Sequence, residues 1–413
     1  MKRYICSIII GMVVILSIGT YYVKVASSAS GLPKYTFKTL EGSSKELDPV
    51  IINGSSLEAN PYFELLTIES NQTTYDSEKS YFESLTGRQD AQMGRLMKEH
   101  RSFMRGKGFI DSFYEDSDFL AYASVNEDFT KSGNMEAKFD IALLEKKSND
   151  ESSFSLELPD QERKMNTNVV DVQLVHSKLQ VLTTNDVNSN DDKQTKEVHL
   201  YTIDLANKKV IGDKTLLSET YNGNDQVEVG MPIDVAPTQS NNMILFSVIK
   251  GVNHEDGPYE EKPKERKLLS YHYETEKLET VNGSEKESLS LDMAKSGYVD
   301  GENLYAVDTK SDKYHIKTFD LSSQKITKDL ELDLAVHKNE EYFATVKNGK
   351  VYILLGNDRY PEEMDYKTKP PRLLIADLKT GKTLYKGETV IQSADQKKKT
   401  KNHGFYIENI EVK

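Results

Sequence analysis

The chain has 413 residues, of which 66 are acidic and 53 basic, and its formal net charge at pH 7 is −13. A protein this acidic repels phosphate backbones, so the charge argues against nucleic acid as a partner. The single cysteine, Cys6, cannot form an intramolecular disulfide, so packing alone must hold the fold together.

An apolar segment follows the basic N-terminus. Lys2 and Arg3 precede an uncharged run over residues 4–23, and about 20 residues at ~1.5 Å each span the ~30 Å hydrocarbon core of a bilayer. The basic residues favour a cytoplasmic N-terminus. We therefore predict a transmembrane signal anchor over residues 1–25 and a single-pass protein of the cell membrane. The small residues up to Ala29 also fit a signal-peptide cleavage site, and cleavage there would make the protein secreted.

The rest of the chain is predicted to lie outside the cytoplasm. Residues 26–34 are rich in Ser, Ala and Gly, which is typical of a flexible tether. Residues 35–413 are predicted to form a single extracytoplasmic domain.

A basic segment occupies residues 88–108, where six basic residues stand against Asp90 and Glu99. Its apolar residues fall on one face of a helix, which predicts an amphipathic helical insertion. These residues are Met93, Leu96, Met97, Phe103 and Met104. Two interpretations fit. In the first, an anionic envelope polymer, lipid headgroups or a partner binds to Arg95, Arg101 and Arg105. In the second, the apolar face packs on the core and the basic charges offset the acidic charge of the rest of the domain.

An acidic insert, residues 186–197, places oxygen-bearing side chains at positions 1, 3, 5 and 12 of a calcium-loop pattern. They are Asp186, Asn188, Asn190 and Glu197. Position 6 of the pattern should be Gly and is Asp191, and strands rather than helices are expected on both sides. Calcium binding and a solvated acidic loop are the two interpretations.

Two longer inserts match each other. Residues 251–268 and 356–373 each span 18 residues and begin at Gly after an apolar strand. They carry exposed-type aromatic and charged residues on proline-containing loops, which suit a protein-binding face. The predicted binding residues there are Tyr259, Glu260, Tyr360 and Tyr366. The alternative is a pair of elaborated hairpin tips without a partner.

One short pattern occurs four times: "HLYTIDLANKKVI", "SYHYETEKLET", "HIKTFDLSSQKIT" and "RLLIADLKTGKTL". Each copy is an apolar strand end, a polar turn and a new strand, so the unit is a β-hairpin. Asp204, Asp320 and Asp377 are placed to accept hydrogen bonds from turn amides, and Gly381 to supply a positive φ.

More apolar strands recur along the whole chain. They begin at residues 63, 119, 179, 243, 304, 351 and 405. A period of about 40 to 60 residues with about four strands per unit is typical of a β-propeller. We therefore expect an all-β fold, a β-propeller of seven blades, with six or eight as alternatives. Residues 35–39 or 50–52 are expected to join residues 405–412 in one blade and close the ring.

The pattern "LLIADLKTGKTL" resembles the repeats of bacterial β-propellers with PQQ-like or YVTN-like units. The resemblance implies the fold and no catalytic residue. The quinone-binding members use a recurrent tryptophan and this chain has none, which argues against quinone.

The sequence contains no zinc helix, nucleophile elbow, phosphate loop or dinucleotide motif. Its histidines lack ligand spacing, and His199 is predicted to serve structure. No cofactor is predicted beyond the calcium candidate. The favoured interpretation is a membrane-tethered binding module, a sensor or accessory subunit, whose partner is another envelope protein or a cell-wall component. Two alternatives stay open: an envelope hydrolase or lyase with a central-channel site, and a quinone- or calcium-dependent oxidoreductase.

Overall fold

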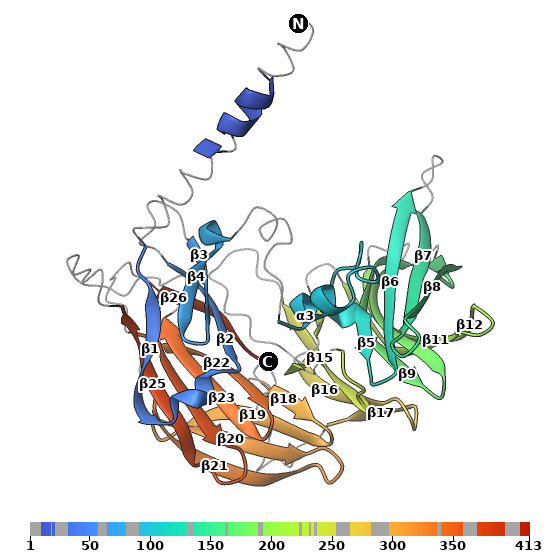
Figure 1. The fold of residues 1–413 in the computed structure, drawn as a ribbon. Coiled ribbons are helices and arrows are strands. Elements are labelled where there is room, and N and C mark those ends of the chain that lie inside the picture. The colour runs from blue at the N-terminus through green and yellow to red at the C-terminus, as the bar shows by residue number, and fades with distance from the viewer. Residues whose placement is uncertain are drawn as a thin grey trace, which may run out of the picture. The chain divides into compact units, whose positions relative to one another are not determined.

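The computed structural model describes most of the chain after residue 32. The described residues are 10–17, 19–20, 32–56, 64–79, 91–129, 135–161, 164–188, 193–222, 225–230, 233–234, 238–252, 265–281, 297–336, 340–357, 370–392 and 405–413. Beyond residue 20 they form an all-β fold with one α-helix, α3 (Ala91–Glu99) (Figure 1). Three short 3-10 helices join strands: η1 (Ser44–Leu47), η2 (Asp76–Glu78) and η3 (Ile110–Ser112).

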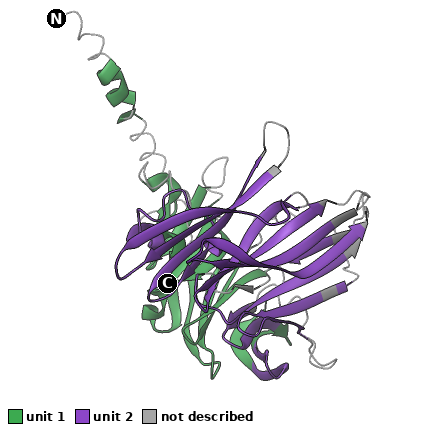
Figure 2. Ribbon diagram, turned by 90° about the vertical axis from the view of Figure 1, so that its right-hand side faces the viewer, with its two compact units in different colours: residues 1–94, 309–316, 330–413 green, residues 95–308, 317–329 purple. Residues whose placement is uncertain are grey.

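The chain divides into two compact units (Figure 2). Unit 1 comprises Met1–Gly94, Thr309–Ile316 and Leu330–Lys413, and unit 2 comprises Arg95–Asp308 and Lys317–Asp329. Unit 1 therefore combines the two ends of the chain, whereas unit 2 is built mainly from its middle.

Unit 1 contains two antiparallel sheets that each include strands from both ends of the chain. The first has the order β26-β2-β3-β4, with β26 (Phe405–Val412), β2 (Val50–Ser56), β3 (Glu64–Glu69) and β4 (Gln72–Tyr75). The second has the order β1-β25-β24-β23-β22, with β1 (Tyr35–Gly42), β25 (Thr383–Ile391), β24 (Arg372–Asp377), β23 (Lys350–Asn357) and β22 (Glu340–Lys347). Backbone pairing thus ties the N-terminal strands to the C-terminal ones.

Unit 2 contains three four-stranded antiparallel sheets. One is β5 (Phe113–Glu115), β6 (Phe119–Phe129), β7 (Met135–Glu145) and β8 (Asp150–Glu157). The next is β9 (Lys164–Val175), β10 (Lys178–Asn188), β11 (Lys193–Asp204) and β12 (Lys209–Asn222). The third is β13 (Asp225–Gly230), β15 (Met243–Val252), β16 (Glu265–His272) and β17 (Lys277–Thr280).

A further sheet is shared by the two units. It contains β18 (Gly297–Asp300), β19 (Asn303–Lys310), β20 (Lys313–Asp320) and β21 (Lys325–Ala335), and the short β14 (Ile233–Asp234) lies parallel to β18. The boundary between the units passes through β19, β20 and β21.

The sequence predicted seven repeats, but the described strands form six sheets. The prediction counted the apolar runs that begin at residues 63 and 405 as two repeats. In the structure β3 and β26 belong to one sheet, because both pair with β2. The expected pairing of residues 50–52 with the C-terminal strand is confirmed, whereas residues 35–39 pair with β25.

Apolar clusters lie between sheets that follow each other in the chain. One cluster joins the β5–β8 and β9–β12 sheets through Phe139, Leu179 and Tyr201. Others join the β9–β12 sheet to the sheet of β13, β15, β16 and β17, and that sheet to the sheet of β18. In unit 1 a single cluster spans both sheets. Successive four-stranded antiparallel sheets that pack in this way give a propeller-like fold.

The aspartates of the repeated hairpins act as predicted. Asp204 Oδ1 accepts from the amides of Ala206 and Asn207, each at 3.0 Å. Asp320 and Asp377 accept amide hydrogen bonds in the corresponding turns. Five turns between third and fourth strands each have a residue with positive φ near their end: Asn149, Lys208, Glu276, Gln324 and Gly381. The shared geometry explains why one sequence pattern recurs along the chain.

The two ends of each sheet differ. Turns between the third and fourth strands are short in every sheet: 70–71, 146–149, 205–208, 273–276, 321–324 and 378–382. Because antiparallel strands alternate in direction, connections between the second and third strands lie at the opposite end. The longest connections between a second and a third strand are 253–264 and 358–371. We call these the turn end and the loop end of a sheet.

Residues 10–17 and 19–20 are helical. Across the part of the chain that the structure describes, we find no helix with the length and apolar character needed to cross a bilayer. The other residues of the predicted anchor, and the predicted tether up to residue 31, lie outside the described residues.

Candidate functional site

The basic segment lies in the connection between β4 and β5, which reaches the β5–β8 sheet at its loop end. The helix is shorter than predicted, since α3 ends at Glu99 and residues 101–106 form turns. Its apolar residues are buried: Met93, Leu96, Phe103 and Met104 are each no more than 4% exposed. The apolar face of this segment therefore serves packing.

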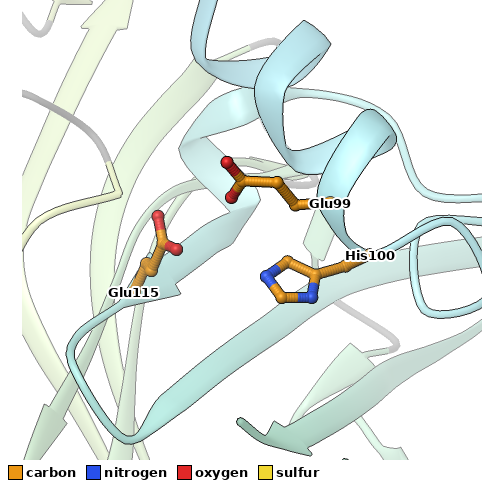
Figure 3. A group of neighbouring side chains, drawn as sticks. All are labelled: Glu99, His100 and Glu115. Atoms are coloured by element: carbon orange, nitrogen blue, oxygen red, sulfur yellow. The ribbon is translucent and has the colours of Figure 1, made fainter.

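Three potential metal ligands meet where α3 joins β5. One donor atom each from Glu99, His100 and Glu115 lie within 4.8 Å of one another. Figure 3 shows the three side chains gathered around one point, two from the end of α3 and one from β5. Carboxylate and imidazole groups in this number are a ligand set that Zn²⁺ accepts.

Two cations already occupy Glu115. Arg95 donates to both of its carboxylate oxygens, and Lys146 Nζ lies 2.7 Å from Oε1. Arg95 Nη1 also lies 2.8 Å from Glu99 Oε2. Burial disfavours the charged form of Glu115, but the hydrogen bonds from Arg95 and Lys146 outweigh it and hold the pKa of this carboxyl below its usual range.

This arrangement is an ion-pair network in which two cations balance two carboxylates. A divalent metal would have to displace Arg95 from Glu115. The two-point hydrogen bonding between a guanidinium and a carboxylate is stronger than an ion pair with a single contact. The network therefore fastens the C-terminal half of α3 to β5. It does not provide an open cation site.

The three predicted binding arginines are thus separated by the structure. Arg95 is committed to Glu99 and Glu115. Arg101 and Arg105 are exposed on the turns after α3, and Lys98 is exposed on the helix. Among the described residues, no acidic side chain pairs with Arg101 or Arg105.

The predicted loop residues Tyr259, Glu260, Tyr360 and Tyr366 lie outside the described residues. Their positions in the chain are fixed by the strands on either side. Both loops join the second strand of a sheet to the third, β15 to β16 and β23 to β24. The two loops therefore occupy equivalent places at the loop ends of two sheets.

The candidate calcium residues are not brought together. Asp186 pairs with Lys196 across the β10–β11 hairpin and Asn185 pairs with Glu197, so Asp186 and Glu197 point to opposite faces of the hairpin. Asp186 accepts from Asn166 at 3.0 Å. Asn188 lies at the end of β10, and Asn190 lies outside the described residues. Opposite faces prevent the two carboxylates from sharing one cation.

The environment of Glu197 explains its orientation. Both ring nitrogens of His199 face carboxylates, with Nε2 2.8 Å from Glu197 and Nδ1 2.7 Å from Asp213. Buried Lys164 donates to Asp213 at 3.2 Å and to the Tyr201 hydroxyl at 2.7 Å. Burial favours the neutral form of Asp213, but His199 and Lys164 outweigh it and lower the pKa of this carboxyl. The cluster cross-links β9, β11 and β12, and its groups satisfy one another.

Sequence reasoning missed a second buried acid, Asp171 on β9. It accepts from the Tyr273 hydroxyl and from Gln173 Nε2 at 3.1 Å. Gln173 in turn accepts from the amide of Asn241 at 2.9 Å. Burial raises the pKa of Asp171 to about 6, although the hydrogen bonds from Tyr273 and Gln173 oppose the shift. The signal in the sequence was one acidic residue within an apolar strand, residues 169–175.

Comparison with known proteins adds little. No protein-family model matches the chain, and no curated protein does. Similar solved structures include polysaccharide lyase Uly1 (11% identity, TM-score 0.37, 64% of this chain and 57% of the lyase). They also include TolB from Acinetobacter baumannii (10%, 0.30, 84% and 65%) and a Synechocystis apocarotenoid oxygenase (9%, 0.41, 92% and 96%). The chain covers less than two thirds of the lyase and of TolB. Similarity at this level does not define a ligand or an activity.

Proposed function

We propose that the protein is a binding module of the cell envelope, held at the membrane by its N-terminal segment, that recognises another envelope protein or a cell-wall component. The observation that carries this proposal is the difference between the two ends of the sheets. The turns between the third and fourth strands are short and alike, and the two matched loops leave from the opposite end. Rigid sheets that carry variable loops at one end are the usual form of a recognition surface.

The two matched loops are the proposed contact elements. The strands that bear them are buried: Leu245, Phe246, Ile353 and Leu354 are fully inaccessible. Loops rooted in such strands keep their ends fixed, which lowers the entropy lost on binding. Tyr259, Tyr360 and Tyr366 supply aromatic area at low entropic cost, and Glu260 supplies charge.

The proposal is tested by photocrosslinking in the native envelope. A photoreactive phenylalanine analogue replaces Tyr259 or Tyr366 in the full-length chain, and crosslinked species are identified by mass spectrometry. We expect a discrete adduct from each position. The matched control places the analogue at Ala206, an exposed residue of a turn end, where no such adduct should form.

Shortening one loop supplies a second measurement. Replacing residues 253–264 with Asn-Gly keeps the β15–β16 hairpin, because this dipeptide favours a two-residue turn. We expect loss of capture of the partner that crosslinks at Tyr259, measured by pull-down, with an unchanged unfolding midpoint. Adducts that form equally from Ala206, or unchanged capture of the partner after residues 253–264 are replaced, would contradict the proposal.

A further inference from the structure

Helix α3 and the turns after it expose cations that have no ion-pair partner in the part of the chain that the structure describes. Five basic and two acidic residues occur between residues 91 and 111, in a chain whose net charge is −13. Two of the five are engaged: Arg95 pairs with Glu99 and Glu115, and Lys107 lies over the Phe103 ring at 4.4 Å. Lys98, Arg101 and Arg105 remain exposed. Within the described residues none of these three has an ion-pair partner.

An exposed apolar residue follows these cations in the chain. Phe109 is 85% exposed, which is more than any other large apolar residue described beyond residue 20. Its backbone has φ 60° and ψ 108°, a combination that bulky residues rarely adopt. The constrained backbone of Phe109 limits the positions that its exposed ring can take. One exposed apolar side chain is ordinary on a soluble protein, but this one follows, within eleven positions, three cations that lack an ion-pair partner among the described residues.

The support beneath this segment is rigid. Phe103 and Met104 are 2% and 3% exposed, so they anchor the turns from below. The Met104 amide donates to His100 O at 3.0 Å, and the Lys107 amide donates to Met104 O at 3.2 Å. The Ser112 amide donates to Phe109 O at 3.1 Å, at the start of η3. The cations and the ring are therefore presented by an ordered surface.

Phosphate headgroups above an apolar layer match this surface. Arginine and lysine bind phosphate oxygens, and each basic residue near an anionic bilayer adds to the attraction. Phenylalanine enters the boundary between headgroups and acyl chains. The acidic remainder of the chain is repelled by an anionic surface, so contact is confined to the locally basic segment.

We infer that residues 98–109 form a docking site for anionic phospholipid headgroups, in which Lys98, Arg101 and Arg105 bind phosphate and Phe109 inserts into the bilayer. The proposed site uses residues outside the two long loops, so it does not depend on their function. It would fix the orientation of the β5–β8 sheet at the membrane surface.

The test uses the fact that the chain has no tryptophan. Phe109→Trp in the full-length protein introduces a single tryptophan, whose emission can be excited selectively, at the proposed insertion point. The protein is mixed with phosphatidylcholine vesicles that contain or lack phosphatidylglycerol, and with vesicles whose acyl chains are brominated. We expect a blue-shifted emission and quenching by bromine with phosphatidylglycerol only, both lost at high salt, which screens the charges.

Two variants give the controls. Arg101→Glu with Arg105→Glu in the Phe109→Trp background should abolish the shift while circular dichroism stays unchanged. Ile211→Trp, at a position 48% exposed on β12, reports attachment of the chain by any other route and should show no shift. Equal shifts with and without phosphatidylglycerol, or quenching in Ile211→Trp, would overturn the inference. A shift caused by a soluble polyanion without lipid would also overturn it, in favour of a polymer ligand.

Discussion

Asp171 makes the stability of the protein depend on pH in an unusual direction. Its folded-state pKa is about 6, above the value of about 3.9 expected in the unfolded chain. The folded protein therefore binds this proton more tightly, and the stabilisation present at low pH is lost as the pH rises through about 6. Two pKa units correspond to about 3 kcal/mol of unfolding free energy.

We expect Asp171→Asn to remove this dependence, because the amide is neutral at every pH. Urea unfolding of both proteins between about pH 4 and pH 7 isolates the contribution of Asp171 to the free energy of unfolding, since the two proteins share all other carboxylates. The wild type should lose stability relative to the variant by up to about 3 kcal/mol over that range. A constant difference between the two proteins would show that Asp171 titrates normally.

The Glu115 network predicts how the protein responds to metal. In the wild type, Zn²⁺ should leave the melting temperature unchanged, because Arg95 and Lys146 occupy Glu115. Arg95→Met removes one of the two competing cations and frees Oε2 of Glu115. It should lower stability by about 1–3 kcal/mol, since Glu115 loses hydrogen bonds at a partly buried site. The same variant should then be stabilised by added Zn²⁺.

Replacing His100 with Ala in the Arg95→Met variant should abolish that rescue, which separates a bound metal from a general salt effect. Calorimetry with and without chelator is the measurement. A Zn²⁺-dependent rise in the wild type would mean that the metal displaces Arg95.

At the scale of elements, the pairing of β2 with β26 leaves no room for a side chain at Gly54. A Cβ on Gly54 in β2 would lie 2.3 Å from the Tyr406 carbonyl oxygen and 2.5 Å from the Phe405 ring. Gly54→Ala must therefore displace β26, and we expect a loss of about 1–3 kcal/mol. Gly212→Ala on β12 is the control, since its Cβ would meet no atom closer than 3.4 Å. Equal stabilities of the two variants, measured by urea unfolding, would contradict this account.

Local chemistry made the hairpins predictable and left their number uncertain. Asp204, Asp320 and Asp377 each act within their own turn, so a short stretch of sequence contains the whole cause. The count of sheets depends on whether residue 405 begins a new sheet or completes the first, and only the pairing of β26 with β2 decides it. Apolar periodicity carries no information about such a distant partner.

The ion-pair network at Glu115 could not be predicted, for the same reason. The sequence around Arg95 does not indicate that it pairs with Glu115, 20 positions away. Nor does it indicate that Lys146, 51 positions from Arg95, binds the same carboxylate. The calcium pattern failed on register, because pairing of Asp186 with Lys196 sends Glu197 to the other face. A hairpin register derived from the strand lengths would have excluded that site from sequence alone.

At the scale of the whole molecule, the two units differ in how they depend on the chain ends. Unit 1 gains β1 and β26 from opposite ends of the sequence, whereas the sheets from β5 to β12 come from one continuous stretch. Residues 405–412 bury Phe405, Tyr406 and Ile407, and each such side chain contributes about 1.5–3 kcal/mol. That sum is comparable with the total stability of a typical domain, about 5–15 kcal/mol.

Ending the chain at residue 404 should therefore unfold unit 1 and spare much of unit 2. In hydrogen exchange followed by mass spectrometry, we expect β2–β4 and β22–β25 to lose protection while β6, β7 and β9–β12 retain it, since cooperative units open separately. A chain that lacks only Lys413, which is exposed, is the control and should exchange like the wild type. Equal loss of protection in β9–β12 would mean that both units fold as one cooperative body, because the C-terminal strand would then stabilise sheets with which it shares no pairing.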